Sequence, residues 1–212
     1  MGKIDDKKKI EERKILEKIY NPSKFTIEDN EPLDFLIIDG NSIFGVEITR
    51  LYYNDGFGRM KNKPNYSLDL EKGKYVHKDD YKNLKIRTTY LLLPSDNKYH
   101  FLFNKVIYTK PKESEFVNII VERIKTKNKK FNQYNKSQAE WFELIISDEN
   151  GYFENELKLS NENEKLIINE VHNSIFKTVY ILSKHHGKEI LHVIGDIPDF
   201  LLKNDNKMSM KL

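Results

Sequence analysis

The sequence contains no cysteine, which excludes a disulfide framework, a thiolate metal site and a cysteine nucleophile. Its apolar runs, such as residues 90–93, are far shorter than the roughly 20 apolar residues of a membrane-spanning helix. The N-terminus is charged and lacks the apolar core of a signal peptide. These absences predict a soluble, cytoplasmic protein with no membrane partner.

Arginine is scarce, since only five of the 36 basic residues are arginine. Basic and acidic residues nearly balance, 36 against 33, so the net charge of +3 does not by itself require a polyanionic partner. A chain of 212 residues is long enough for one domain with a sizeable core. We expect a single domain over residues 1–202 and a flexible tail over residues 203–212.

Hydrophobic periodicity predicts helices at residues 3–20, 113–134 and 163–175. Strands are predicted at residues 25–27, 33–38, 43–51, 84–93, 99–108, 141–147, 177–182 and 189–194. Residues 52–81 mix glycine, aromatic and basic residues without a clean period, and we expect a long loop with one short helix. The order of these elements predicts a mixed sheet covered by helices, of the α/β or α+β class.

The turn sequence DGNS at residues 39–42 predicts a hairpin. A two-residue turn and a four-residue loop both place Asp34 opposite Glu47, whereas a three-residue turn places Val46 opposite Asp34. Opposed carboxylates with Cβ atoms about 5 Å apart repel each other unless a cation lies between them. Their hard oxygens favour Mg²⁺ or Mn²⁺. The alternative is an ordinary hairpin whose acids reach solvent.

A helical wheel of about 100° per residue gives residues 113–134 one apolar stripe. Lys127 lies in the middle of that stripe, while Lys125, Lys129 and Lys130 project to its sides or away. The stripe consists of Phe116, Ile120, Ile124, Phe131 and Tyr134. A lysine in this position either extends its stem over apolar surface or has a function.

The same wheel places Glu12 in the apolar stripe of the first helix, whereas Glu11 and Glu17 lie off it. The stripe consists of Ile15, Leu16 and Ile19. Burying an isolated carboxylate is costly, so Glu12 either reaches water near the helix end or belongs to a site.

The sequences EPLDF at residues 31–35 and GVEIT at residues 45–49 resemble the catalytic core of the PD-(D/E)xK nuclease superfamily. They are most similar to a subset of uncharacterised bacterial proteins with the patterns E-x-PDF and G-(I/V)-E-(V/I)-T. The resemblance covers the N-terminal quarter, and beyond it only the element order agrees. It implies a restriction-endonuclease-like α/β fold with a mixed sheet flanked by helices.

The resemblance also implies a metal site. Asp34 and Glu47 match the two metal-binding acids, and the carbonyl of Ile48 matches a further ligand for Mg²⁺ or Mn²⁺. A glutamate from the preceding helix often joins such sites, which makes Glu12 a candidate third acid and Glu31 a weaker one.

Two positions depart from the family pattern. Leu33 replaces the proline before the aspartate, and Thr49 replaces the lysine that activates water and offsets charge on the phosphate. Members of the superfamily are known to relocate this lysine to a neighbouring helix, and Lys127 is the predicted substitute. The spacing of Ile124, Lys127, Lys130 and Tyr134 is similar to the pattern I-x2-K-x2-K-x3-Y of the same subset. Thr49 is expected to hydrogen-bond nearby.

Aromatic, basic and glycine residues alternate at residues 52–63, directly after the predicted metal-binding strand. Such a composition is typical of a mobile loop that stacks on bases and contacts phosphates, and an ordinary surface loop is equally compatible. The candidate substrate-binding residues are Arg50, Tyr52, Arg59, Lys61 and Lys63.

The predicted function is hydrolysis of phosphodiester bonds by a metal-dependent nuclease, with DNA preferred over RNA and a homodimer as a compatible assembly. The first alternative is a catalytically inactive nuclease fold that binds nucleic acid or protein, which Thr49 favours. The second is a protein-interaction module whose hairpin acids are incidental. The six histidines show no metal-ligand spacing.

Overall fold

The computed structural model describes residues 2–74, 76–107, 112–130, 132, 138–148, 159–185, 188–202 and 209–211. The chain forms two compact units. The first comprises Met1–Leu51 and Lys112–Leu212, and the second comprises Tyr52–Pro111. The second unit is therefore an insertion within the range that the sequence assigns to one domain.

The first unit is built on a mixed sheet with the strand order β1-β2-β3-β6-β7-β8-β9. Its strands are β1 (Thr26–Asp29), β2 (Phe35–Asp39), β3 (Ser42–Arg50), β6 (Trp141–Asp148), β7 (Phe176–His185), β8 (Lys188–Gly195) and β9 (Ser209–Lys211). Its helices are α1 (Gly2–Leu16), α5 (Glu113–Asn128), α7 (Asn161–His172) and α8 (Asp199–Leu202). The central pairs β3–β6 and β6–β7 are parallel, whereas β1–β2, β2–β3 and β7–β8 are antiparallel. The predicted α/β class with a mixed sheet flanked by helices is confirmed.

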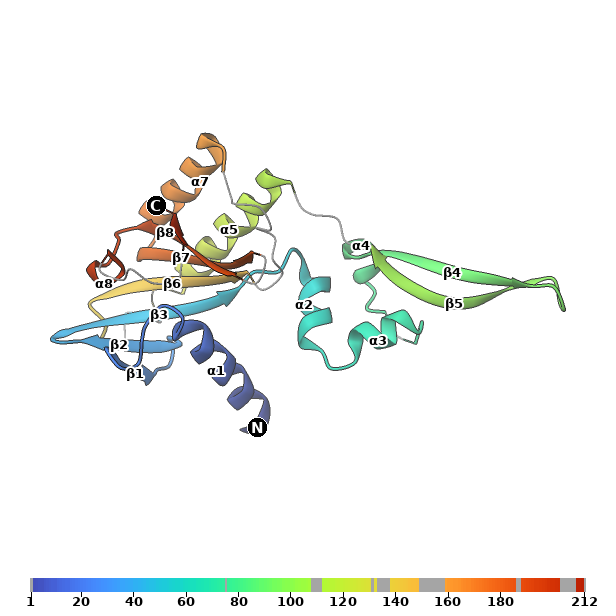
Figure 1. Ribbon diagram of the computed structural model, residues 1–212, viewed down its shortest axis with the longest axis horizontal. Helices are drawn as coiled ribbons and strands as arrows, with labels where there is room; N and C mark the ends of the chain where they lie inside the picture. Colours follow the sequence, from blue (N-terminus) through green and yellow to red (C-terminus); the bar gives the residue numbers. More distant parts are fainter. Residues whose placement is uncertain are drawn as a thin grey trace. The chain divides into compact units, whose positions relative to one another are not determined.

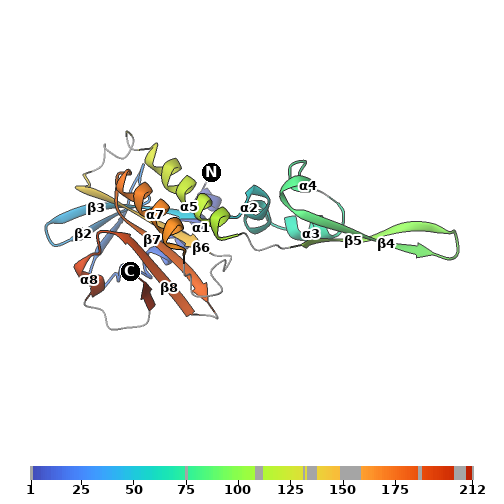
Figure 2. The ribbon, with the colours of Figure 1, turned by 90° about the horizontal axis from the view of Figure 1, so that it is seen from above.

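Helices cover both faces of this sheet (Figure 1). Helices α5 and α7 pack on one face, where Figure 2 shows them side by side, and α1 packs on the other. The side-chain alternation in β6 follows this division: Leu144 and Ile146 face α5 and α7, whereas Ile145 faces α1. The central strands of this sheet are apolar over most of their length, because helices bury both of its faces.

The β2–β3 hairpin has the register in which paired residue numbers sum to 81, as in Phe35↔Val46 and Asp39↔Ser42. The connection is a two-residue turn in which Gly40 has a φ of +60°, a conformation that glycine adopts without strain. The register predicted for a two-residue turn is confirmed, and the one-residue slip of a three-residue turn does not occur.

Three ends differ from the sequence-based expectation. Helix α1 stops at Leu16, and the turns that follow bring Ile19 and Tyr20 into the core. Helix α5 ends at Asn128, and Phe131 and Tyr134 lie outside the described residues. In the expected tail, residues 209–211 form β9 beside β8, while residues 203–208 and 212 are outside the described part.

The second unit consists of three short helices and a two-stranded antiparallel sheet. They are α2 (Asp55–Asn62), α3 (Tyr66–Glu71), α4 (Asp80–Asn83), β4 (Lys85–Leu93) and β5 (Lys98–Ile107). The loop expected over residues 52–81 is wrong, because Asn54 caps α2 by accepting from the Phe57 N–H at 3.1 Å and helices this short show no apolar period. The hairpin over residues 85–107 is confirmed, but it forms its own sheet. No helix among the residues described here is long and apolar enough to cross a membrane.

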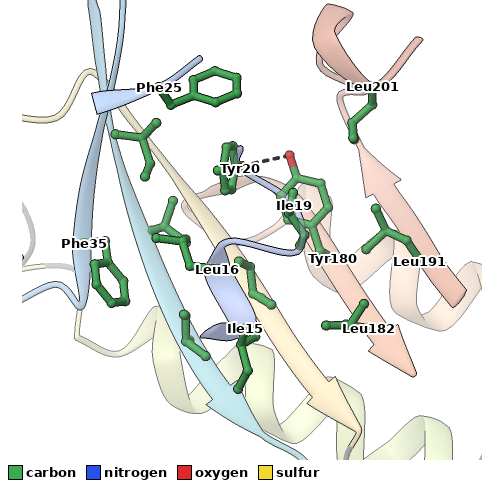
Figure 3. Packing of buried hydrophobic residues seen from close by; sticks show 14 of the residues in the cluster. Ile15, Leu16, Ile19, Tyr20, Phe25, Phe35, Tyr180, Leu182, Leu191 and Leu201 are labelled. Atoms are coloured by element: carbon green, nitrogen blue, oxygen red, sulfur yellow. Dashed lines mark hydrogen bonds between the residues drawn. The ribbon is translucent and has the colours of Figure 1, made fainter. Parts of the chain in front are cut away.

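A buried polar cluster lies inside the core between α1 and the sheet. The hydroxyls of Tyr20 and Tyr180 both donate to Glu143 and lie 3.1 Å apart, as the dashed line in Figure 3 shows. The indole N–H of Trp141 donates to the other Glu143 oxygen at 3.1 Å. Trp141 also stacks on Phe44 with ring centroids 5.0 Å apart and packs against the core. Burial raises the pKa of Glu143, although three donors oppose that shift.

Glu143→Gln is expected to gain stability relative to the wild type as the pH rises. The raised native pKa means that Glu143 favours folding below its unfolded value of 4.5, and that this contribution is lost as the pH rises through the native value. Glutamine carries no such titration. Urea unfolding at pH 4.5 and pH 8 measures the free energy of unfolding of both proteins. Between these pH values, that of the variant should rise relative to the wild type by about 1.4 kcal/mol for each unit by which the native pKa is raised. Glu122→Gln, at a side chain 68% exposed, should show no such change.

Candidate functional site

Two carboxylates meet where the β2–β3 ladder ends. Glu47 lies in the middle of β3 and is only 2% exposed. Asp34 immediately precedes β2, and its Oδ2 accepts the Ile48 N–H at 2.7 Å. Because the N–H and carbonyl of one strand residue point to the same side, the Ile48 carbonyl faces this edge as well. Asp34, Glu47 and Ile48 are thus brought together as predicted.

Gly45 explains how the EPLDF segment is held against β3. A Cβ at this position would lie 2.5 Å from Leu33 Cδ1 and 3.0 Å from Phe142 Cδ1, so only glycine admits the Leu33 side chain. Leu33 is 1% exposed and belongs to the core beneath α5 and α7. Leu33 therefore anchors the segment and positions the adjacent Asp34.

Helix α5 supplies the cationic side of the site. Lys127 donates to Glu47 Oε1, and its Nζ lies 3.5 Å from the Ile48 carbonyl oxygen. The predicted location of Lys127 against the core is confirmed. The Lys130 Nζ lies 3.8 Å from the same Glu47 oxygen, so Lys130 also reaches this carboxylate, although the helical wheel placed it to the side of the stripe or away from it. Lys130 follows the end of α5, where the ideal helical wheel no longer fixes the direction of a side chain.

The second oxygen of Glu47 is buried. Glu47 Oε2 is buried without a hydrogen-bond partner among the described residues. An unpaired buried carboxylate oxygen is costly, and native structures usually provide a donor, a water molecule or an ion for it. Asp34 lies close enough to this carboxylate for its charge to act on Glu47.

Helix α1 adds a third acid and two lysines. Glu12 is 6% exposed, and its carboxylate lies 3.2 Å from the Lys8 ammonium. The Lys9 Nζ donates to the Asp34 carbonyl at 2.8 Å, which ties α1 to the start of β2. Glu31 is exposed and lies 4.0 Å from Lys9. Sequence reasoning missed Lys8 and Lys9, because exposed lysines near a helix N-terminus give no periodic signal.

Burial and the charge of Asp34 raise the pKa of Glu47 and of Glu12. Burial, followed by the charge of Asp34, raises the pKa of Glu47, and the Lys127 ammonium only partly opposes this. Burial, followed again by the charge of Asp34, raises the pKa of Glu12. The cluster thus carries more negative charge than its environment stabilises, and a bound cation would relieve it.

Two neighbours in β3 have other surroundings. Thr49 is half-buried, faces the same side of the strand as Glu47 and pairs with Ile146 of β6. Arg50 bonds to Glu11 at 2.6 Å, a contact that lowers the pKa of Glu11 and joins β3 to α1. Arg50 thus forms an ion pair with Glu11, and its role in substrate binding stays a prediction.

The remaining predicted substrate-binding residues belong to the second unit. Arg59 pairs with Asp80, a fully buried carboxylate that also accepts from the Tyr66 hydroxyl. The Tyr52 hydroxyl donates to Asn62 at 3.3 Å. The Lys63 ammonium lies 5.7 Å from the centroid of the Tyr66 ring, and Lys61 is exposed. Arg59 is thus a structural residue of this unit.

Arg59→Ala is expected to destabilise the second unit by about 3–5 kcal/mol, because it leaves the buried Asp80 carboxylate without its cation. Thermal unfolding of the purified variant measures this loss, and Lys61→Ala is the matched control on the same helix. Equal melting temperatures for both variants would contradict the structural role of Arg59.

The donor set tests whether a metal ion fits here. Among the residues that the structure describes, no three His, Cys, Asp or Glu side chains form a group that could hold a metal ion. An ion at this edge would therefore use two carboxylates together with a backbone carbonyl or water. The hard oxygens of Asp34, Glu47 and Ile48 suit Mg²⁺ or Mn²⁺, and the orphaned Oε2 of Glu47 is compatible with such an ion.

Comparison of the chain with protein-family models, curated proteins and solved structures finds no match in any of the three. The functional argument therefore depends on the arrangement of the residues themselves.

Proposed function

We propose that this protein is a divalent-metal-dependent nuclease of the PD-(D/E)xK type with a restriction-endonuclease-like fold. The observation that carries the proposal is the buried Oε2 atom of Glu47, which has no hydrogen-bond partner among the described residues, in a carboxylate that accepts from Lys127 and is subject to the charge of Asp34. The element order supports it, because both acids lie at the end of one hairpin ladder on a mixed sheet flanked by helices.

Each residue has a role in this proposal. Asp34, Glu47 and the Ile48 carbonyl would hold Mg²⁺ or Mn²⁺. When bound, the ion polarises a phosphodiester and lowers the pKa of a water molecule. Lys127 offsets negative charge that develops on the phosphate, the role of the lysine that Thr49 replaces.

The substrate would be nucleic acid, with DNA preferred over RNA. Lys130 adds a second positive charge at Glu47, so both lysines are placed to contact a phosphate that displaces them from the carboxylate. Glu12 holds its charge near Asp34 and would orient water.

Titration with Mn²⁺ is expected to raise the melting temperature of the wild type. An ion that binds only the folded state adds about 2.7 kcal/mol at a concentration of one hundred times Kd. The double variant Asp34→Asn, Glu47→Gln should show no Mn²⁺-dependent shift, whereas Glu122→Gln, which removes an exposed acid from α5, should behave as the wild type. The absence of a shift in the wild type would overturn the metal site.

The second candidate is an inactive nuclease-fold subunit that binds nucleic acid. Thr49 and the pairing of Glu47 with Lys127 and Lys130 favour it, because two ammonium groups already partly neutralise the acid. This candidate predicts nucleic-acid binding with neither a Mn²⁺-dependent shift nor cleavage, so the same titration separates the two.

A further inference from the structure

The β4–β5 hairpin of the second unit has one face that packs against the helices and one that faces solvent. On the inner face, the Asn104 amide donates to the Leu70 carbonyl at 2.9 Å, and Val106 packs with Leu70 and Leu84. The opposite side of the ribbon, which we call the outer face, consists of the cross-strand pairs Lys85↔Ile107, Arg87↔Lys105 and Thr89↔Phe103. Apart from the half-buried Thr89, all of these residues are exposed.

The outer face places two cations directly opposite each other. Arg87 and Lys105 are cross-strand partners, so their Cβ atoms are about 5 Å apart, and like charges at this spacing destabilise a sheet. Neither has an acidic partner within the described part of the chain. An anion held between the two side chains would turn this repulsion into attraction.

The β4–β5 hairpin carries a net positive charge. Residues 85–107 contain four basic residues and one acid, Asp96, which gives a formal +3 with His100 neutral. The whole chain also carries +3, so the remaining residues sum to zero. The hairpin is thus one of the basic segments of the chain, and its partner is expected to be anionic.

An aromatic side chain adjoins the cation pair. Phe103 is 37% exposed, and Ile107 on the same face is 42% exposed. Figure 2 shows β4 and β5 as a two-stranded ribbon, which is at most marginally stable without a packing partner. Cations beside an exposed ring match the two requirements of a single nucleic-acid strand, phosphate neutralisation and base stacking.

We propose that the outer face binds single-stranded nucleic acid, with a phosphate between Arg87 and Lys105 and a base on the Phe103 ring. A second copy of the chain is disfavoured as occupant, because it would bring another cation pair against the first. The inference rests on the proposed function, because the outer face would be the surface that binds the substrate of the nuclease. Binding is nevertheless tested separately from cleavage.

The test measures anisotropy of a labelled single-stranded 20-nucleotide DNA with the full chain in EDTA, so that cleavage cannot occur. Removal of two phosphate contacts by Arg87→Ala with Lys105→Ala should weaken binding and reduce the salt slope by about 1.4. Phe103→Ala should weaken binding about 5- to 150-fold. Lys72→Ala removes an exposed lysine from the same unit and should have little effect. The double variant Arg87→Ala with Lys105→Ala removes a like-charge repulsion and should melt at or above the wild-type temperature, and thermal unfolding checks the fold of Phe103→Ala.

Unchanged affinity in both outer-face variants would overturn the inference, as would equal affinity for a blunt duplex, whose base faces are covered. Self-association that Phe103→Ala abolishes in sedimentation would assign the face to a second copy, and binding only to anionic vesicles would assign it to lipid. Hydrolysis of bis(p-nitrophenyl) phosphate with Mn²⁺ separates this inference from the proposed function. DNA binding without hydrolysis leaves the inference standing alone, whereas hydrolysis without binding leaves only the nuclease.

Discussion

Glu47→Gln is expected to reduce Mn²⁺-dependent DNA cleavage to the metal-free level. The substitution keeps the size of the side chain but removes the negative charge of Glu47, to which Lys127 donates and on which the charge of Asp34 acts. A neutral amide is a poor ligand for a hard divalent ion, so the site loses half of its carboxylate charge. Asp34→Asn should have the same effect, because Asp34 is the other carboxylate of the pair.

The fold should survive Glu47→Gln, since a buried charge is replaced by a neutral group of the same shape. Circular dichroism and thermal unfolding provide this check, and a panel of single-stranded and double-stranded DNA and RNA measures cleavage. Glu122→Gln, a neutralised acid on the exposed side of α5, should cleave like the wild type. Undiminished cleavage by either Glu47→Gln or Asp34→Asn would falsify the proposed function.

Lys127→Ala is expected to lower cleavage by about 10²–10³-fold, the usual cost of removing one positively charged or donor group that stabilises a transition state. The variant should also unfold more easily in EDTA, by roughly 3–5 kcal/mol at neutral pH, because it breaks a buried ion pair. Mn²⁺ should restore part of that stability by taking the place of the ammonium group beside Glu47.

The pH dependence of this variant has a definite sign. Without Lys127, the more distant Lys130, which follows the end of α5, is left to oppose the effect of burial, so the pKa of Glu47 rises further above its ordinary 4.5. The destabilisation should therefore disappear as Glu47 is protonated below pH 4.5 and grow as the pH rises through the native value. Unfolding in urea at pH 4 and pH 8 measures the difference.

Two controls separate charge from packing at Lys127. Lys125→Ala lies on the same helix, with a side chain 46% exposed, and should change neither stability nor cleavage. Lys127→Arg keeps the charge and should retain much of the stability. If Lys127→Arg and Lys127→Ala were equally destabilised in EDTA, the ion pair with Glu47 would not be the cause.

The local part of the site could be predicted from the sequence. The register of β2 and β3 follows from a two-residue turn at Gly40-Asn41, and that register brings Asp34 and Glu47 to the same edge. Helical periodicity was sufficient to place Lys127 against the core, because its neighbours in α5 are regular and apolar.

Contacts between distant residues could not be predicted in this way. Arg59 looks like a phosphate ligand in the sequence, but its partner Asp80 lies 21 positions later in a segment without periodicity. Glu143 gathers donors from Tyr20 and Tyr180, which are 160 residues apart. Lys130 lies past the end of α5, where a helical wheel no longer predicts the direction of a side chain. In each case the deciding interaction depends on tertiary packing.

The insertion of the second unit determines when the acidic cluster can be completed during synthesis. Glu47 and Lys127 are 80 positions apart, and the whole inserted unit is translated between them. At about 5–20 residues per second, a ribosome takes roughly 4 to 16 s to cover that interval. The nascent chain therefore carries β3 with its carboxylate uncompensated until α5 emerges. Release of the chain before that helix is made would leave a fragment in which Glu47 lacks its ion pair with Lys127.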